Sequence, residues 1–230
     1  MHVPDGFLDA PTSVATGAAA VVIVGAALRG ARRELDDKTT PLAGLVGAFV
    51  FATQMLNFPV GAGTSGHLMG GTIAAVLVGP WTGVLVMSCV FIVQCLLFAD
   101  GGITALGTNI ILMGVITAGV GWLVFTLIRK VAPNRLGVVA PAAAVGALIS
   151  VPVAAVAFTL LYAVGGTADI SIGSLAAAMI GWHTLIGIGE AIITFLAVGS
   201  ILAVRPDLVY GARPILAQRD RQLIVKGATA

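Results

Sequence analysis

Long apolar stretches separated by short polar segments make up most of this chain. They cover residues 11–30, 41–57, 67–78, 81–99, 103–128, 137–164 and 174–204. A helix needs about 20 mostly apolar residues to cross the hydrocarbon core of a membrane. The pattern therefore predicts an all-α integral membrane protein of about seven transmembrane helices, with residues 1–204 as one transmembrane domain and 205–230 as a polar tail.

The division between the third and fourth stretches depends on a Gly-Pro pair. Residues 68 to 99 are predominantly apolar and too many for one span of about 17–25 residues. Gly79-Pro80 is the natural break, because proline lacks a helix donor and restricts the residue before it.

The charged residues test this division. With seven spans, all twelve Lys and Arg fall on one face, whereas joining the two stretches moves Arg129, Lys130 and Arg135 to the other face. The opposite face carries only acidic residues: Asp5, Asp9, Asp100 and Asp169. Because basic residues favour the cytoplasmic side, we predict an N-terminus outside and a cytoplasmic C-terminus. The first stretch has acids before it and arginines after it, the reverse of a signal peptide, so we expect it to be retained.

The composition argues against a water-soluble domain. Charged residues make up 10% of the chain and hydrophobic residues 58%, whereas soluble domains average about 25% charged residues. Cys89 and Cys95 lie in one apolar stretch and form neither a metal-ligand nor a disulfide pattern. The phosphate-binding loop motif, GxxxxGK followed by Ser or Thr, does not occur, so we expect no ATP hydrolysis by this chain. We also expect no enzyme activity and no nucleic-acid partner.

The third stretch is short and follows a glycine-rich loop. His67 to Val78 cover about 18 Å at 1.5 Å per residue, well under the roughly 30 Å hydrocarbon core. The preceding residues 58–66 are uncharged and unsuited to a helix. Non-helical backbone at membrane depth survives only where protein covers it or where it lines a cavity. We therefore expect His67 below the outer surface, at the start of a half-length helix, with the loop folded inward to build a binding site.

Three histidines occur, His2, His67 and His183, and His2 directly follows the terminal residue. The amine of Met1 and the deprotonated amide of His2 can close a five-membered ring on a metal ion. The same amide and Nδ1 of the imidazole close a six-membered ring, and His67 can provide a fourth nitrogen. Four nitrogens in a plane suit Ni(II) or Cu(II), and low-spin Co(II) accepts the same arrangement. Taken alone, however, His2 is more simply explained as part of a frayed terminus.

Several longer motifs carry a family resemblance that covers essentially the whole chain. They are MHVPDGFL at 1–8, NFPV at 57–60, GTSGHL at 63–68, GTNIILMG at 107–114, HTLIGIGE at 183–190 and RPDL at 205–208. In these motifs the chain resembles the cobalt/nickel substrate-binding subunits, the CbiM/NikM family, of energy-coupling-factor (ECF) ABC transporters. The opening and the GTSGHL motif are specific together, and each alone is less so.

The resemblance implies a helix added before a six-helix core, which inserts the N-terminus into the protein. It implies Co²⁺ or Ni²⁺ as the transported substrate, bound by the amine of Met1, the amide and imidazole of His2, and His67. It further implies a multi-pass protein of the cell membrane that works with two ATPase subunits, a transmembrane coupling subunit and a small additional membrane subunit. The ligands are the same for both metals, so the sequence does not separate cobalt from nickel.

Four further polar residues are candidates for supporting the site. His183 and Glu190 share one helix face and should face the interior, because both are costly in lipid. They either orient a ligand and balance metal charge or form a structural hydrogen-bonded pair, and the sequence does not choose. We expect Asn57 and Asn109 to hold residues 1–6 in place rather than to ligate.

The second stretch carries small residues at four-residue spacing: Gly44, Ala48 and Ala52. Small residues let helices in a membrane approach closely. This stripe is therefore a candidate contact with the coupling subunit that the resemblance implies.

Two other functions fit parts of the sequence. Residues 63–66 fit the GxSG motif of rhomboid intramembrane serine proteases, with Ser65 and His183 as a dyad. In that family, however, the serine lies on the fourth core helix, and here it follows the second span. A proton-coupled secondary transporter of divalent metals could use Glu190 and His183 as a relay, although the chain shows no repeated half.

Overall fold

The computed structural model of this protein describes residues 1–56, 58–61 and 64–228. Its helices follow the apolar stretches, because lipid offers the backbone no hydrogen-bond partner outside its own helix. They are α1 (Ala10–Ala31), α2 (Thr39–Gln54), α3 (Gly71–Val78), α4 (Pro80–Phe98), α5 (Leu106–Asn109), α6 (Thr117–Val131), α7 (Val139–Gly165), α8 (Ile172–Val204) and α9 (Arg213–Ala228). A π-helical segment, Ile110–Ile116, joins α5 to α6, and short 3₁₀ turns precede α7 and α9.

Within the described ranges, five helical stretches are long and apolar enough to cross a membrane: Ala10–Ala31, Pro80–Phe98, Leu106–Val131, Leu136–Gly165 and Ile172–Val204. This confirms the predicted class, an all-α integral membrane protein. α2 has 16 residues and α3 has eight, so both are shorter than these five. The count of seven spans and the outward N-terminus stay predictions.

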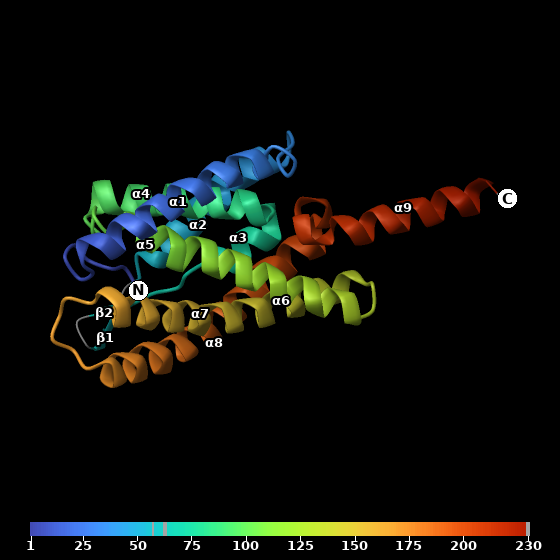
Figure 1. The fold of residues 1–230 in the computed structure, drawn as a ribbon. Coiled ribbons are helices and arrows are strands. Elements are labelled where there is room, and N and C mark those ends of the chain that lie inside the picture. Colours follow the sequence, from blue (N-terminus) through green and yellow to red (C-terminus); the bar gives the residue numbers. More distant parts are fainter. Residues whose placement is uncertain (57, 62–63, 229–230) are drawn as a thin grey trace.

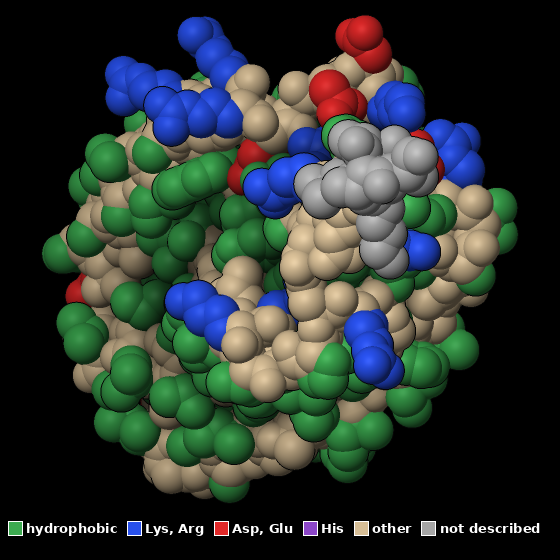
Figure 2. Space-filling view, turned by 90° about the vertical axis from the view of Figure 1, so that its right-hand side faces the viewer, with side chains coloured by type: hydrophobic (Ala, Val, Ile, Leu, Met, Phe, Trp, Pro, Cys, Tyr) green, Lys and Arg blue, Asp and Glu red, His purple; other side chains and the backbone are tan. Residues whose placement is uncertain are grey.

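The long helices lie side by side along one direction (Figure 1). The N-terminus, the hairpin of β1 and β2, and the connection between α7 and α8 lie toward one end, which we call the site end. α1 and α6 finish at the opposite end, from which α9 projects. Figure 2 views this opposite end face-on, where Lys and Arg side chains stand around the rim. We call it the basic end.

α3 lies inside the bundle, and all eight of its residues are buried. Glycines let α3 and α6 approach each other. A Cβ on Gly71 of α3 would overlap Thr117 of α6, and a Cβ on Gly121 of α6 would overlap Thr72 of α3. Oγ1 of Thr72 donates to the carbonyl of Thr117 at 3.1 Å and lies 2.9 Å from Oγ of Ser150 on α7. Small residues and shared hydroxyl groups thus pack this helix closely against its neighbours.

The third apolar stretch differs from its prediction at its start. α3 begins at Gly71, so His67 lies four residues before the helix rather than at its first position. The reason is Gly70, whose φ of +81° is left-handed and stops the helix from extending back toward His67. At the other end the chain breaks at Gly79, with φ of +104°, directly before Pro80.

The glycine-rich loop forms a hairpin that the sequence analysis did not predict. β1 (Phe58–Gly61) pairs antiparallel with β2 (Thr64–Gly66), with Phe58 opposite Gly66. Strand pairing gives this non-helical backbone the hydrogen-bond partners that it needs at depth. The second strand leads directly to His67.

Candidate metal centre

The N-terminal segment runs into the helix bundle instead of fraying into solvent. Met1, His2 and Val3 are buried, whereas residues 4–6 are exposed. Asn109, the last residue of α5, holds both backbone groups of Val3: its Oδ1 accepts the N–H at 2.8 Å, and its Nδ2 donates to the carbonyl at 3.2 Å. These paired bonds carry the terminal amine into the protein interior.

The rest of the segment is anchored to two loops at the site end. Oδ1 of Asp5 accepts from the backbone N–H and the hydroxyl of Thr104, at 2.8 and 2.6 Å. Asp9 caps the N-terminus of α1, because its side chain accepts the N–H of Thr12 at 2.9 Å. The N–H of Asp9 donates to the carbonyl of Gly165 at 2.7 Å. These bonds set how far residues 1–3 reach into the bundle.

Gly101 and Gly102 leave room for the inserted segment. Gly101 has a φ of +93°, which favours glycine. A Cβ on Gly102 would overlap the backbone of Asp5, and the Gly102 N–H donates to the Val3 carbonyl at 2.9 Å. This role of the two glycines was not predicted. Their position directly after Asp100, at the end of an apolar stretch, could have indicated a close approach of another backbone.

The imidazoles of His2 and His67 stack, with ring centroids 4.5 Å apart and 25° between their planes. Both rings are buried. Nδ1 of His67 donates to the carbonyl of Leu68 at 2.7 Å, which leaves the lone pair of Nε2 free. In the part of the chain that the structure describes, Nε2 of His67 and both ring nitrogens of His2 make no aligned hydrogen bond. Buried nitrogens in this condition suit a metal ion.

Asp100 lies against the ring of His2. Its Oδ1 is 2.7 Å from Nδ1 of His2, which is within ion-pair distance. The two groups are nevertheless not aligned as a hydrogen bond. Asp100 follows Ala99, whose left-handed φ of 52° ends α4. The end of this helix therefore directs a carboxylate at the inserted terminus. The sequence analysis had placed Asp100 only on the outer face.

The remaining candidate nitrogens belong to the backbone. Burial lowers the pKa of the Met1 amine to about 4, and the negative charge of Asp100 only partly opposes this shift. The amine is therefore neutral at neutral pH, and its lone pair is available. No hydrogen bond among the described residues occupies the amide of His2. Among the same residues, no group of three His, Cys, Asp or Glu side chains is placed to hold a metal ion.

His183 and Glu190 are both buried on α8, and their described hydrogen bonds go to the backbone rather than to each other. Nδ1 of His183 donates to the carbonyl of Met179 at 2.7 Å, and its Nε2 has no described partner. Glu190 accepts the N–H groups of Met69 and Gly70, at 2.7 and 2.9 Å. Glu190 thereby holds the segment that comes directly after the second stacked histidine.

The structure thus brings the predicted ligands Met1, His2 and His67 together at the site end, with Asn109 beside them. Asn57 and the side chain of Ser65 lie outside the described residues. The helical bundle thus buries several unpaired nitrogens close together, and such groups in an apolar interior are typical of functional sites.

A family model described as the CbiM cobalt uptake substrate-specific transmembrane region matches residues 2–208. The chain belongs to this family. It therefore has a role in the uptake of a transition metal.

Individual relatives agree with this assignment. Over 210 residues the chain is 40% identical to a provisionally named metal transport protein of Haloquadratum walsbyi. This match covers 91% of this chain and 94% of the relative. Over 212 residues the chain is 32% identical to the cobalt transport protein CbiM of Sorangium cellulosum, covering 91% and 94%. The crystal structure of a truncated transition metal transporter matches with a TM-score of 0.81 and 31% identity, covering 88% of this chain and 99% of that one.

Proposed function

We propose that this protein is the substrate-capturing subunit of an ATP-driven ECF importer for cobalt or nickel ions. One observation supports this proposal above the others. The rings of His2 and His67 stack in the interior with unpaired nitrogens, beside an N-terminus that is buried and neutral. A cation receptor has to provide such lone pairs without protonated groups that repel the ion.

In the proposed site four nitrogens bind the ion. They are the amine of Met1, the amide and Nδ1 of His2, and Nε2 of His67. Deprotonation of the amide on binding offsets part of the metal charge. Because Nδ1 of His2 lies 2.7 Å from Oδ1 of Asp100, an ion bound at Nδ1 has to displace that contact. Asp100 then remains nearby as a counter-charge for the ion.

The proposed site end faces outward, and α1 is the helix added before a six-helix core. The protein would sit in the cell membrane and release the ion inward after the complex reorients. Two ATPase subunits, a transmembrane coupling subunit and a small additional membrane subunit complete the proposed importer. This division of labour fits a chain without the phosphate-binding loop motif.

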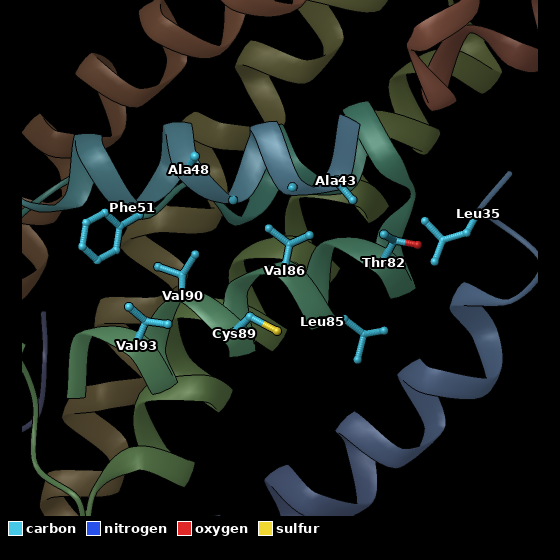
Figure 3. A pocket seen from close by; sticks show the side chains of 12 residues that line it. Leu35, Ala43, Ala48, Phe51, Thr82, Leu85, Val86, Cys89, Val90 and Val93 are labelled. Atoms are coloured by element: carbon cyan, nitrogen blue, oxygen red, sulfur yellow. The ribbon is translucent and has the colours of Figure 1, made fainter. Parts of the chain in front are cut away.

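A groove between α2 and α4 lies where the small-residue stripe had been predicted (Figure 3). It has a volume of about 440 Å³, and Gly44, Gly47 and Ala48 form part of its wall on the α2 side. Ala52 is not among the lining residues. The groove is our candidate for the contact with the coupling subunit, since small residues there admit another helix closely.

The register of the N-terminus provides the test. One residue added before Met1 converts the amine into a peptide nitrogen, and an alanine inserted between Met1 and His2 lengthens the chelate ring. Either change, like His2→Ala or His67→Ala, should abolish metal retention while membrane insertion and helix content stay native. The purified proteins are loaded with Co(II) or Ni(II), and bound ions are counted.

Ser65→Ala is the control and should retain metal. If Ser65 proves essential while His67 is dispensable, the intramembrane protease alternative returns. If the extended protein holds metal as well as the native chain does, the N-terminal chelate is wrong and the site has to be rebuilt from His67, His183 and Glu190. Acidification should also release the ion, because protons compete with it for the same nitrogens.

A further inference from the structure

Two glutamines form a buried polar row that leads to the metal centre. Gln54 on α2 and Gln94 on α4 are both fully buried. Nε2 of Gln54 donates to the carbonyl of Met69 at 2.6 Å, and a carbonyl can only accept. Oε1 of Gln54 therefore faces Gln94 and accepts from its Nε2 at 2.9 Å. One backbone carbonyl thus fixes the orientation of both amides.

This orientation leaves Oε1 of Gln94 as the free acceptor at the end of the row. Across the described residues it has no hydrogen-bond partner, although it is buried. An unpaired buried acceptor destabilises a folded protein. Such a group therefore needs an explanation. One explanation is a ligand whose binding places the proton of a neighbouring imidazole on the nitrogen that faces this acceptor.

The neighbouring ring belongs to His2. Phe91 and Gln94 are three residues apart on α4 and share a face, and the Phe91 ring meets the His2 imidazole edge-on at 5.9 Å. Nε2 of His2 is, like Oε1 of Gln94, buried and without a hydrogen-bond partner among the described residues. Since Asp100 lies at Nδ1, Nε2 is the ring nitrogen left for Gln94.

From this geometry we infer that Gln94 is a positioning residue of the metal centre, whose Oε1 accepts the Nε2–H of His2 when a metal ion occupies Nδ1. The inference rests on the proposed function. A neutral imidazole that gives Nδ1 to a metal carries its proton on Nε2, and ligating histidines generally donate that proton to a fixed acceptor. Gln94 therefore selects the tautomer that can bind.

The row also connects the two histidines. It runs from His2 through Gln94 and Gln54 to the carbonyl of Met69, two residues after His67. A shift of α2 against α4 changes both ring positions together. Gln94 thus sets the distance between two ligands that lie 65 positions apart in the sequence, the difference between 67 and 2.

The test measures the affinity for Ni(II) alone and the visible absorption spectrum of the bound ion, using the full-length purified protein. Gln94→Met keeps the side-chain length and removes the acceptor. It should weaken Ni(II) binding by about 10–100-fold and shift the spectrum, because His2 loses its orientation. Gln54→Met breaks the row one step further away and should weaken binding less. Ser88→Ala, which removes a buried hydroxyl bonded only within α4, is the control and should change neither quantity.

Gln94→Glu keeps an acceptor oxygen toward His2 and makes it a stronger one, while its second oxygen cannot donate and gives up the bond to Oε1 of Gln54. It should retain Ni(II) and move the absorption band of the ion to higher energy, because His2 becomes a stronger donor. An unchanged spectrum in Gln94→Glu, or native affinity and spectrum in Gln94→Met, overturns the inference while leaving the proposed chelate intact. If His2→Ala binds Ni(II) as the native chain does, the chelate itself is wrong and the inference falls with it.

Discussion

Two buried carboxylates bind the backbone in the same way. Near the middle of α8, beside the segment that follows His67, Glu190 accepts the N–H groups of Met69 and Gly70, at 2.7 and 2.9 Å. At the basic end Glu34 accepts those of Trp81 and Thr82, at 3.2 and 2.7 Å. Both glutamates are almost completely buried, at 2% and 3% exposed. Each therefore places a negative charge on two consecutive peptide N–H groups.

The surroundings of the two carboxylates differ. Around Glu34 the chain provides positive charge, because Arg213 donates to its backbone carbonyl at 3.1 Å and to Asp36 at 2.7 Å. Neither carboxylate has a salt bridge within the residues that the structure describes. At the basic end, however, the pair of Arg213 and Asp36 forms a balanced structural clamp beside Glu34. Glu190 has no such pair beside it among the same residues, and it holds the segment that directly follows His67.

The largest expected effect concerns which end faces outward. In a protein whose native Cys89 and Cys95 have been replaced by alanine, Asp169→Cys at the site end should react with an impermeant thiol reagent added to intact cells. Arg33→Cys at the basic end should react only after the membrane is opened, since basic residues favour the cytoplasm. Mass-shift labelling measures both. The opposite labelling pattern would overturn the orientation and the seven-span prediction with it.

Glu190→Gln should have the next largest effect. The amide keeps one acceptor oxygen but turns its NH₂ group toward the second backbone N–H, so one of the two bonds is lost and the charge disappears. Metal affinity should fall by about 10–100-fold, as for residues that orient ligands. Equilibrium dialysis with Co(II) or Ni(II) checks it, and circular dichroism serves as the folding control. Complete loss of binding in a folded protein would identify Glu190 as a direct ligand.

Glu34→Gln makes the same chemical change at the basic end and is the matched control. It leaves one buried N–H at the start of α4 unpaired, which should lower the free energy of unfolding by about 1–3 kcal/mol. Metal affinity should stay native, because the site end is untouched. Denaturant unfolding in detergent and dialysis give the two readouts. Loss of metal affinity here would mean that the two ends are coupled and that the contrast drawn between them is false.

The sequence predicts local features of this structure well. Hydropathy alone located the long helices, and proline chemistry located the break at Gly79-Pro80. The glycine-rich stretch ahead of His67 indicated a non-helical segment, and its described residues are indeed strands. The structure buries Met1 and His2, and their chelation of a metal ion stays a prediction.

Contacts between distant segments were mostly beyond the reach of such patterns. The expected contact of Asn109 with the N-terminal segment is confirmed at Val3, across 106 positions, but the contact of Glu190 with Met69 across 121 positions was not predicted. Periodicity indicates which face of a helix is buried but not which residue it meets. The sequence therefore gave Glu190 two roles and left Gln94 with none. The left-handed Gly70, which separates His67 from α3, was likewise hidden, since a glycine in an apolar run also fits a helix interior.

Arg213→Ala should have the smallest effect and tests the balanced end directly. Arg213 joins the start of α9 to the segment before α2 through Asp36 and Thr39, both at 2.7 Å. It also lies over the ring of Tyr210, 4.9 Å from its centroid. Partly exposed ion pairs contribute about 0–1 kcal/mol, so global stability and metal affinity should change little. Limited proteolysis should nevertheless cut the tail faster, because α9 loses its attachment.

The acid dependence of this clamp follows from Asp36. Hydrogen bonds from Thr39 are the largest cause that lowers its pKa to about 2, and the charge of Arg213 is the smallest. A lowered carboxyl pKa means that its stabilising contribution is present above the ordinary value near 3.8 and is lost as pH falls toward 2. Arg213→Ala should therefore leave the acid-unfolding profile almost native while protection of the tail is lost. Arg221→Ala, which removes the same charge from a residue whose described hydrogen bond stays within α9, should leave both unchanged. Equal tail cleavage in the two variants would show that charge in general, rather than the clamp, holds α9 to the basic end.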